Sequence, residues 1–306
     1  MGVDRTPGRG DELVLRPGCK VNLYLRITGL RPDGYHDLET LFFPLDKPCD
    51  VLRLRPGSAG SGLVLTCDRP ELAGAGNLVA KAHAAFTATT GLRLDLACRL
   101  EKGTPMAAGL GGGSADAAAM LTALNALAGN AALSDEALAK VAAGLGADVP
   151  FFLLGRPAWA TGKGEVLRPV SEPLTALMGA TLVLACPSVA VSTAWAYKAW
   201  DERVGVGGVA ETKGADESFL TISRREDNVT GRTWNGVLCN SFEDAVFPAF
   251  PELRLLKERF LRSGAAGALL SGSGSSVFAV FRDPDEAAST AVALRRDGVA
   301  VYVRRV

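Results

Sequence analysis

Two residue types that often build active sites are scarce in this chain. Its 306 residues include only two histidines, and its six cysteines stand singly, with no Cys-x-x-Cys pair. We therefore do not expect a structural zinc site, and no residue is assigned as a metal ligand. Single cysteines of this kind are typical of free thiols in a reducing compartment.

The sequence also lacks an excess charge of either sign and lacks a membrane-spanning run. Basic and acidic residues number 33 each, so no basic field is present to hold a nucleic acid backbone. A long uncharged stretch at residues 174–197 is interrupted by Pro187 and by serine and threonine. We do not expect the polar start of the chain to be a secretion signal. We expect a cytoplasmic protein whose partner is neither nucleic acid nor membrane.

The chain is long and apolar enough to bury a sizeable core, since 48% of its residues are hydrophobic. We expect two α+β domains, at residues 11–170 and 171–306, after a disordered tail at 1–10. Residues 203–235 are rich in glycine and charge, and we interpret them as an insertion in the second domain. The sequence is silent on the oligomeric state.

Short β-like runs separated by turns fill the first domain, together with three helical patterns. The predicted strands lie at residues 12–16, 21–28, 40–45, 50–54, 63–67 and 92–100, and the helices at 77–89, 117–127 and 135–145. In the second domain, strands at 181–185, 266–270, 276–281 and 299–304 alternate with helices at 193–201, 251–262 and 284–295. That order matches the split β-α-β-β-α-β arrangement of a ferredoxin-like domain.

A glycine cluster runs directly into an alanine-rich helix pattern at residues 105–119. Gly109, Gly111, Gly112 and Gly113 allow the backbone to approach a ligand closely, and Ser114 closes the loop. The positive end of the following helix would then face that loop. The pattern therefore predicts a phosphate cradle, with a merely flexible loop as the alternative. A Walker A loop is excluded because no Gly-Lys-Ser/Thr follows.

On these residues the chain resembles the GHMP kinases, whose signature is Pro-x-x-x-Gly-Leu-Gly-Ser-Ser-Ala. The resemblance implies a β-rich N-terminal domain like that of ribosomal protein S5, a ferredoxin-like C-terminal domain, and ATP with Mg²⁺. It places the nucleotide on Pro105, Gly109, Leu110, Gly111, Gly112, Gly113, Ser114 and Ala115.

Three further segments narrow the resemblance to one branch of that family. They lie at residues 20–29, 31–41 and 144–152, and the Asp-Gly-Tyr-His sequence of the second is the most discriminating. The branch phosphorylates the 2-hydroxyl of a small-molecule substrate, a cytidine diphosphate-linked methylerythritol, in the non-mevalonate isoprenoid pathway. Two alternatives stay open: a kinase of the same family acting on mevalonate or homoserine, and a catalytically silent nucleotide-binding protein.

Lys20 and Asp148 are the catalytic candidates that the resemblance implies. Each stands beside an apolar run, so both could be drawn into a partly desolvated cleft and form a pair there. Phosphoryl transfer needs a group that orients or accepts the hydroxyl proton and a cation that stabilises charge. We assign the first role to Asp148 and the second to Lys20.

The remaining candidates are also implied by the resemblance, and each has a purely structural alternative. Asn77 would lie near the adenine or cap a helix, and Lys102 would lie near the nucleotide or be an exposed turn charge. Tyr35 and His36 follow a turn that could aim both rings outward, to stack on and hydrogen-bond a cytosine. The other substrate-binding candidates are Asn22, the glycines Gly272 and Gly274 of a late turn, and Tyr197, for which a core-facing helix position is the alternative.

Overall fold

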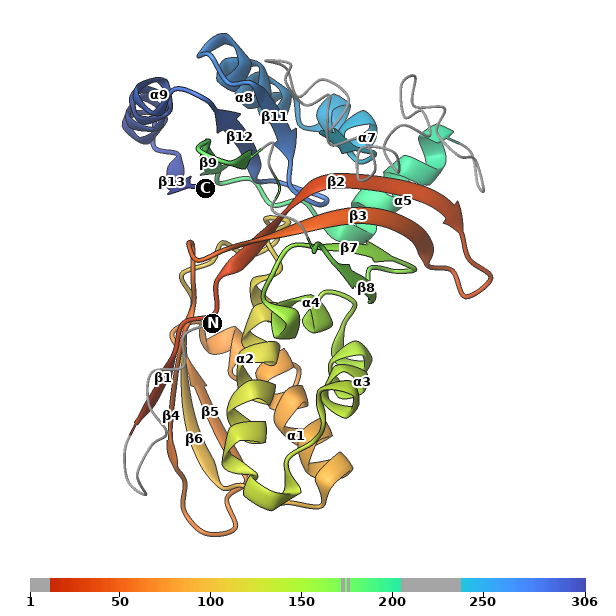
Figure 1. Cartoon of the computed structure of the whole chain (residues 1–306), viewed down its shortest axis with the longest axis vertical. Helices are drawn as coiled ribbons and strands as arrows, with labels where there is room; N and C mark the ends of the chain where they lie inside the picture. Colours follow the sequence, from red (N-terminus) through yellow and green to blue (C-terminus); the bar gives the residue numbers. More distant parts are fainter. Residues whose placement is uncertain (1–11, 172–173, 175–176, 205–237) are drawn as a thin grey trace. The chain divides into compact units, whose positions relative to one another are not determined.

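The chain folds into two compact units that are interleaved along the sequence (Figure 1). The computed structural model describes residues 12–171, 174, 177–204 and 238–306. Unit 1 comprises residues 1–20, 44–105 and 111–156, and unit 2 comprises residues 21–43, 106–110 and 157–306. The predicted tail and residues 205–235 of the predicted insertion lie outside the described residues. The domain boundary near residue 170 stays a prediction.

Unit 1 is built on a four-stranded sheet with helices packed on it. The strand order is β1 (Leu13–Leu15), β4 (Val51–Pro56), β6 (Leu96–Glu101) and β5 (Leu63–Cys67). β5 pairs with β6 in parallel, and the other two pairs are antiparallel. Burial alternates along β4 and β6, as expected where helices cover one face of a sheet.

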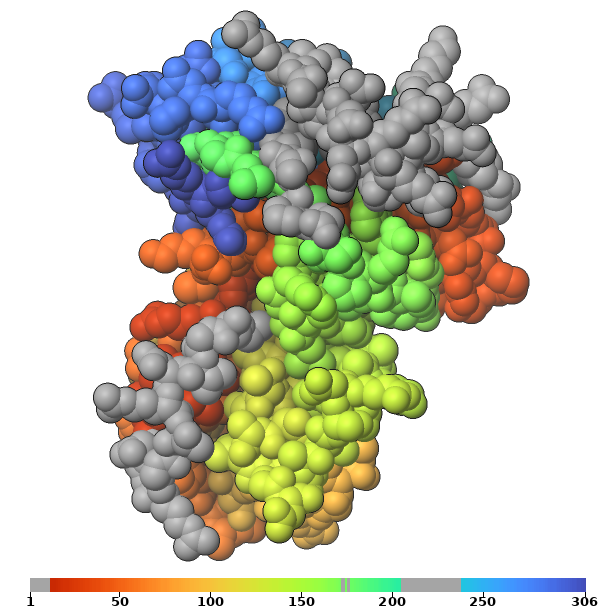
Figure 2. Space-filling model, viewed as in Figure 1, coloured from red at the N-terminus to blue at the C-terminus, as the bar shows by residue number. Residues whose placement is uncertain are grey.

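The helices of unit 1 surround α2, which carries the alanine-rich sequence. They are α1 (Leu78–Thr90), α2 (Gly112–Leu127), α3 (Asp135–Leu145) and α4 (Val149–Leu154), with the short 3-10 helices η1 (Pro70–Leu72) and η2 (Gly129–Ala131). Every residue from Ala115 to Leu121 is buried, so all sides of this part of α2 are covered. The yellow-to-lime segment from the end of α2 through α3 forms much of the visible surface of unit 1 (Figure 2).

Unit 2 contains a long-stranded sheet that carries the Asp-Gly-Tyr-His segment. Its strand order is β10 (Cys239–Asn240), β2 (Cys19–Leu30), β3 (His36–Leu45), β7 (Ala158–Thr161) and β8 (Val166–Pro169). A turn at residues 31–35 connects β2 to β3 and ends immediately before His36. The first two residues of β2, Cys19 and Lys20, belong to unit 1.

The second sheet of unit 2 has the ferredoxin-like arrangement that the sequence predicted. Its strand order is β11 (Gly267–Leu270), β12 (Val277–Phe281), β9 (Thr181–Cys186) and β13 (Ala300–Arg305), and every neighbouring pair is antiparallel. In chain order this is 2-3-1-4, which places the first strand between the third and the fourth. β9 and β12 are buried along their whole length because both are central strands.

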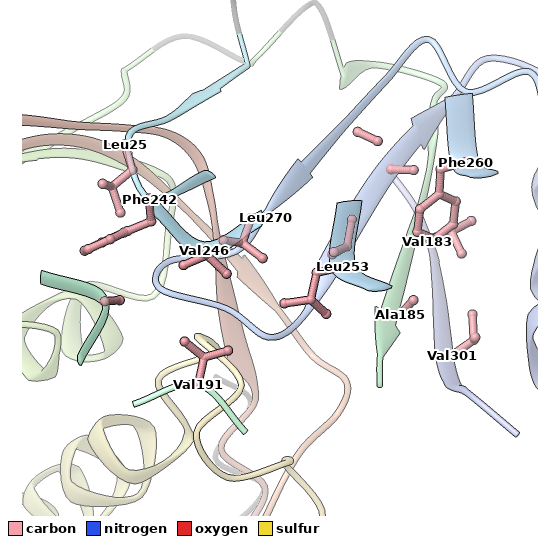
Figure 3. Packing of buried hydrophobic residues seen from close by; sticks show 14 of the residues in the cluster. Leu25, Val183, Ala185, Val191, Phe242, Val246, Leu253, Phe260, Leu270 and Val301 are labelled. Carbon is pink, nitrogen blue, oxygen red and sulfur yellow. The ribbon is translucent and has the colours of Figure 1, made fainter. Parts of the chain in front are cut away.

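Helices cover this sheet and complete its apolar core (Figure 3). They are α5 (Thr193–Val204), α7 (Glu243–Ala249), α8 (Pro251–Arg262) and α9 (Pro284–Arg296). Val183 of β9 lies in the same cluster as Leu253 and Phe260 of α8. Among the described helices, none combines the length and apolarity needed to cross a bilayer. The two sets of sheets and helices confirm the predicted α+β class.

Candidate active site

The glycine loop ends at the N-terminus of α2, where it forms an anion cradle. Gly111 is the N-cap residue and adopts a left-handed conformation with φ of 72°. The next three N–H groups, of Gly112, Gly113 and Ser114, have no carbonyl within the helix to bond. Ala115 is the first residue to bond back, from its N–H to the Gly111 carbonyl at 2.9 Å. Unpaired donors and the helix dipole together favour a bound phosphate.

Side chains packed around the cradle require glycine at its first positions. A Cβ atom on Gly111 would lie 3.0 Å from the Phe152 ring and 3.4 Å from Cε of Lys20. A Cβ atom on Gly112 would lie 2.9 Å from Cγ2 of Thr104. The space beside these two glycines is therefore filled by α4, Lys20 and Thr104, and neither glycine can be enlarged without a shift of its neighbours.

The predicted pairing of Lys20 with Asp148 is confirmed. Lys20 Nζ lies 3.8 Å from Asp148 Oδ2, a separation that allows electrostatic attraction but exceeds a hydrogen bond. The Lys20 side chain is 6% exposed and the Asp148 side chain 30% exposed. Burial lowers the pKa of Lys20, and the nearby Asp148 carboxylate opposes that change. The carboxylate is thus the member of the pair that a ligand can reach more easily.

A buried cluster of one lysine and two aspartates connects β6 to α2. Lys102 Nζ contacts the carboxylate of Asp50 and lies 2.7 Å from Asp116 Oδ2. Asp50 Oδ1 also accepts hydrogen bonds from the N–H groups of Gly103 and Thr104, both at 2.7 Å. The Lys102 side chain is only 8% exposed, so the alternative of an exposed turn charge is wrong. The cluster holds the chain that enters the glycine loop against the first turn of α2.

Burial and the neighbouring charges shift the pKa values of Asp116 and Lys102 in this cluster. Burial raises the pKa of Asp116 to about 8; Lys102 counteracts that rise and Asp50 adds to it. Burial alone would lower the pKa of Lys102, but the two aspartates outweigh it, so that pKa is raised. Asp116 Oδ1 is buried without a hydrogen-bond partner among the described residues. We infer that Asp116 holds a proton near neutral pH while Lys102 stays charged.

Asn77 is a helix cap in this structure. Its side-chain oxygen accepts a hydrogen bond from the N–H of Val79 at 2.8 Å, and its amide nitrogen donates to the carbonyl of Leu72 at 2.8 Å. The capping alternative is therefore confirmed, and contact with adenine stays a prediction. Pro105, at the start of the loop, is partly exposed.

The first half of the glycine loop belongs to unit 2 and is bonded to the late glycine turn. Gly109 has φ of 72°, and a Cβ atom there would lie 1.9 Å from the Ser271 carbonyl oxygen. Ser271 Oγ donates to the Gly109 carbonyl at 3.1 Å, and the Ser276 N–H donates to the Ala108 carbonyl at 3.2 Å. Leu110 is buried, so its side chain packs instead of facing a ligand.

The late turn itself is held by a side chain of β10. Gly272 and Gly274 have φ of 55° and 87°, which only glycine adopts easily. Asn240 Nδ2 donates to the carbonyls of Leu270 and Gly272 at 2.8 and 2.7 Å. Substrate contact by the two glycines stays a prediction, and Asn240 is a supporting residue that the sequence did not indicate.

Tyr35 lies at the end of a tightly bonded turn and is 60% exposed. The Arg31 N–H donates to the Tyr35 carbonyl at 2.7 Å, and the Tyr35 N–H donates to Asp33 Oδ1 at 3.2 Å. Lys163 Nζ lies 4.4 Å from the centroid of the Tyr35 ring. The ring is therefore presented outward, as predicted, and carries an ammonium group on one face.

His36 is not aimed outward, contrary to the prediction. It is 7% exposed, because β3 begins at His36 and directs its ring toward α5. The ring stacks on Tyr197 with a centroid distance of 4.6 Å and meets Trp200 edge-on at 5.8 Å. His36 Nε2 lies 2.7 Å from Asp201 Oδ1. Tyr197 is partly buried, so it packs against the core and also forms a platform for His36.

Asn22 is buried in the β2–β3 sheet instead of lying open to a ligand. Its Nδ2 donates to Thr40 Oγ1 at 2.8 Å, and Thr40 Oγ1 donates to the Tyr24 carbonyl at 2.6 Å. A substrate contact by Asn22 stays a prediction.

Two protein-family models match this chain and define its class. The GHMP kinases N terminal domain matches residues 77–156, and the GHMP kinases C terminal domain matches residues 225–300. The first match contains α1, the glycine loop, α2 and Asp148. The fold and the matched motifs together define a small-molecule kinase that uses ATP.

Similar proteins identify the branch of that class. A 4-diphosphocytidyl-2-C-methyl-D-erythritol kinase of Nitratidesulfovibrio vulgaris is 45% identical over 95% of this chain and 98% of its own length. A crystal structure of 4-(cytidine 5'-diphospho)-2C-methyl-D-erythritol kinase matches with a TM-score of 0.72 and 35% identity, over 95% of this chain and 98% of that one. The chain belongs to the 4-diphosphocytidyl-2-C-methyl-D-erythritol kinase family.

A more distant structure shares the fold alone. The homoserine kinase of Cytophaga hutchinsonii matches with a TM-score of 0.71 over 99% of this chain and 96% of that one, at 21% identity.

Sequence reasoning missed the acidic partners of Lys102 and of His36. Asp50, Asp116 and Asp201 each stand in ordinary local contexts, and their partners are distant in the sequence. One signal was present for Asp201, because it follows Tyr197 by four residues in a predicted helix and so shares its face.

Proposed function

We propose that this chain transfers the γ-phosphoryl group of ATP to the 2-hydroxyl of 4-diphosphocytidyl-2-C-methyl-D-erythritol. The names of its relatives support that substrate. The observation that carries the chemistry is the Lys20–Asp148 pair, with Lys20 Cε 3.4 Å from the position that a Cβ atom on Gly111 would take.

Asp148 takes the role of the group that orients and accepts the hydroxyl proton. As the proton moves to its carboxylate, the hydroxyl oxygen forms a bond to the γ-phosphorus, the bond from that phosphorus to the β-phosphate oxygen breaks, and ADP leaves. The 30% exposure of Asp148 supports this role, since a buried carboxylate would be out of reach of a substrate.

Lys20 acts through charge. Its ammonium group lies 3.8 Å from Asp148 Oδ2 and beside Gly111, where it can stabilise negative charge on the phosphoryl group. Burial disfavours the charged form of Lys20. An anion close to its ammonium group, whether the Asp148 carboxylate or a phosphoryl group, is therefore stabilising.

The N-terminus of α2 supplies the donors for the ATP phosphates. Among the described residues, no group of three or more histidine, cysteine or carboxylate side chains could hold a metal ion. Mg²⁺ would arrive bound to the nucleotide, where it would neutralise phosphate charge. Its binding requires no dedicated protein cage.

Residues of unit 2 would recognise the cytosine of the substrate. Tyr35 offers an exposed ring, and base stacking on such a ring is worth about 1–3 kcal/mol. His36 offers a polar ring edge held by α5, and Tyr197 backs that ring.

A substrate panel with matched variants tests the proposal. Wild-type protein should phosphorylate 4-diphosphocytidyl-2-C-methyl-D-erythritol in preference to mevalonate and homoserine. Asp148→Asn should lower kcat by roughly 10²-fold or more and leave ATP affinity nearly unchanged, because the lost group acts in the transition state. Glu136→Gln, at a side chain 80% exposed on α3, is the control and should match wild type. Near-normal turnover of Asp148→Asn would refute its role, and turnover of mevalonate or homoserine alone would refute the substrate.

A further inference from the structure

One side of the His36 ring is occupied by three residues from successive positions on a single helix face. Tyr197, Trp200 and Asp201 are spaced i, i+3 and i+4 on α5, so they lie on adjacent turns. The first two bound the ring by stacking and by an edge contact, and Asp201 Oδ1 lies 2.7 Å from Nε2. The ring orientation is therefore set by α5.

Asp201 also sets the tautomer of that ring. A carboxylate can only accept a hydrogen bond, so the neutral imidazole must carry its proton on Nε2 and donate it to Asp201. Nδ1 is then left with a lone pair. In the described part of the chain Nδ1 has no hydrogen bond, and it is not among the fully buried atoms without a partner, so part of its surface stays accessible in a ring that is otherwise buried.

A bare Nδ1 distinguishes the two pyrimidines. Cytosine presents an amino group at C4, which can donate a hydrogen bond to Nδ1. Uracil presents a carbonyl oxygen at the same position, and an acceptor facing an acceptor loses the bond and leaves both groups unpaired. With the proton on Nδ1 instead, the ring would favour the carbonyl oxygen of uracil over the amino group of cytosine.

We propose that Asp201 is the residue that determines base specificity: by accepting the Nε2 proton of His36, it keeps Nδ1 as an acceptor for the amino group of cytosine and excludes uracil. This inference rests on the proposed cytidine diphosphate substrate and goes beyond it. Asp201 is a positioning residue, since it acts on the base through His36.

Binding of CDP and UDP to the full chain, measured by calorimetry, tests the proposal. Wild-type protein should prefer CDP. In Asp201→Asn an amide can either accept from or donate to Nε2, so both tautomers become accessible, and the CDP-to-UDP affinity ratio should fall roughly ten- to a hundredfold. ATP affinity should not change. Asp201→Glu, which retains a carboxylate, should recover part of the ratio.

Glu202→Gln is the matched control. Glu202 is the next residue of α5, its side chain is 69% exposed, and it pairs with Lys198. This variant should retain the wild-type ratio. A role of Asp201 in helix stability alone would weaken CDP, UDP and ATP binding together, and that result would overturn the proposal.

Nitrogen NMR of the wild-type protein gives a readout that needs no variant of Asp201. The chain has only two histidines, so His83→Gln assigns the His36 signals. In the CDP complex we expect a protonated Nε2 and an unprotonated Nδ1; a proton on Nδ1 would overturn the proposal. A wild-type ratio in Asp201→Asn would overturn it while leaving the substrate intact. Wild-type protein that binds CDP and UDP equally would refute both the specificity and the cytidine substrate.

Discussion

Replacing Gly111 by alanine changes the first residue of the phosphate cradle and nothing else in it. At φ of 72°, a residue with a Cβ atom costs about 1–2 kcal/mol more than glycine. The new Cβ atom would also lie 3.0 Å from two atoms of Phe152, which is 4% exposed and packed edge-on against Phe151. Overpacking of this kind costs about 1–3 kcal/mol. The free energy of unfolding should therefore fall by about 2–5 kcal/mol.

The same substitution should damage nucleotide use. Relief of the contact requires a shift of Phe152, of Lys20 or of the helix end, and a displacement of about 1 Å at a reacting centre can cost roughly 10²-fold. Urea unfolding followed by circular dichroism measures the first effect, and kcat/KM for ATP measures the second. We expect both to fall in Gly111→Ala.

Gly144→Ala is the control for that experiment. Gly144 lies in α3 without a positive φ, and an added Cβ atom there would meet nothing within 4 Å. This change should stabilise the protein by up to about 1 kcal/mol and leave ATP kinetics unaltered. If Gly111→Ala unfolds at the wild-type urea concentration with wild-type kcat/KM, the left-handed cap and its contacts do not shape the cradle, and the reasoning is refuted.

Two further predictions concern buried ionisable groups. Because Asp116 keeps its proton up to about pH 8 in the folded protein but ionises near 3.8 when unfolded, its contribution to stability is complete below about pH 4 and is lost as the pH rises through 8. The total is on the order of 5 kcal/mol at most, so Asp116→Asn should flatten the decline in urea-unfolding free energy between pH 5 and 9, and an unchanged slope would contradict the assigned proton. His36→Ala should weaken binding of the cytidine substrate and spare ATP affinity; calorimetry that finds equal losses for both ligands would indicate a general disruption of the fold instead.

Helices and strands with strong local signals could be predicted from the sequence. The predicted helix at 135–145 matches α3, because Ser134 caps its start through a hydrogen bond from the Ala137 N–H. The predicted helix at 251–262 matches α8, which begins at a proline. The four predicted strands of the C-terminal sheet also formed, because each is an apolar run bounded by turn residues.

Elements with weak local signals were not predicted. β7 and β8 are four residues each, and β10 has two, too few for a periodic pattern to emerge. α7 contains Pro248, which normally argues against a helix. Tertiary contacts, rather than local propensity, determine these elements.

The residues of the candidate site also fall into those that the local sequence reveals and those that it does not. Lys20, Asp148 and the glycines could be identified because they stand in contiguous motifs. The burial of His36 and the paired state of Lys102 could not be predicted, since Asp201 is 165 residues from the first and Asp50 is 52 residues from the second. When two charged residues are distant in the sequence and pair only in the folded protein, the sequence around each of them does not reveal the pair.

The burial of α2 from Ala115 to Leu121 connects the stability of the protein with the position of the N–H groups at the start of that helix. Ala118, Met120 and Leu121 are buried and lie within about 14 Å, along the helix axis, of the first N-terminal donor, at about 1.5 Å of rise per residue. Because this segment of α2 is packed on all sides, any tilt of the segment also moves the N-terminus of the helix. Substitutions that loosen the packing around this part of α2 should therefore also shift the N–H groups of Gly112, Gly113 and Ser114, and variants that melt at a lower temperature should bind ATP more weakly while still folded.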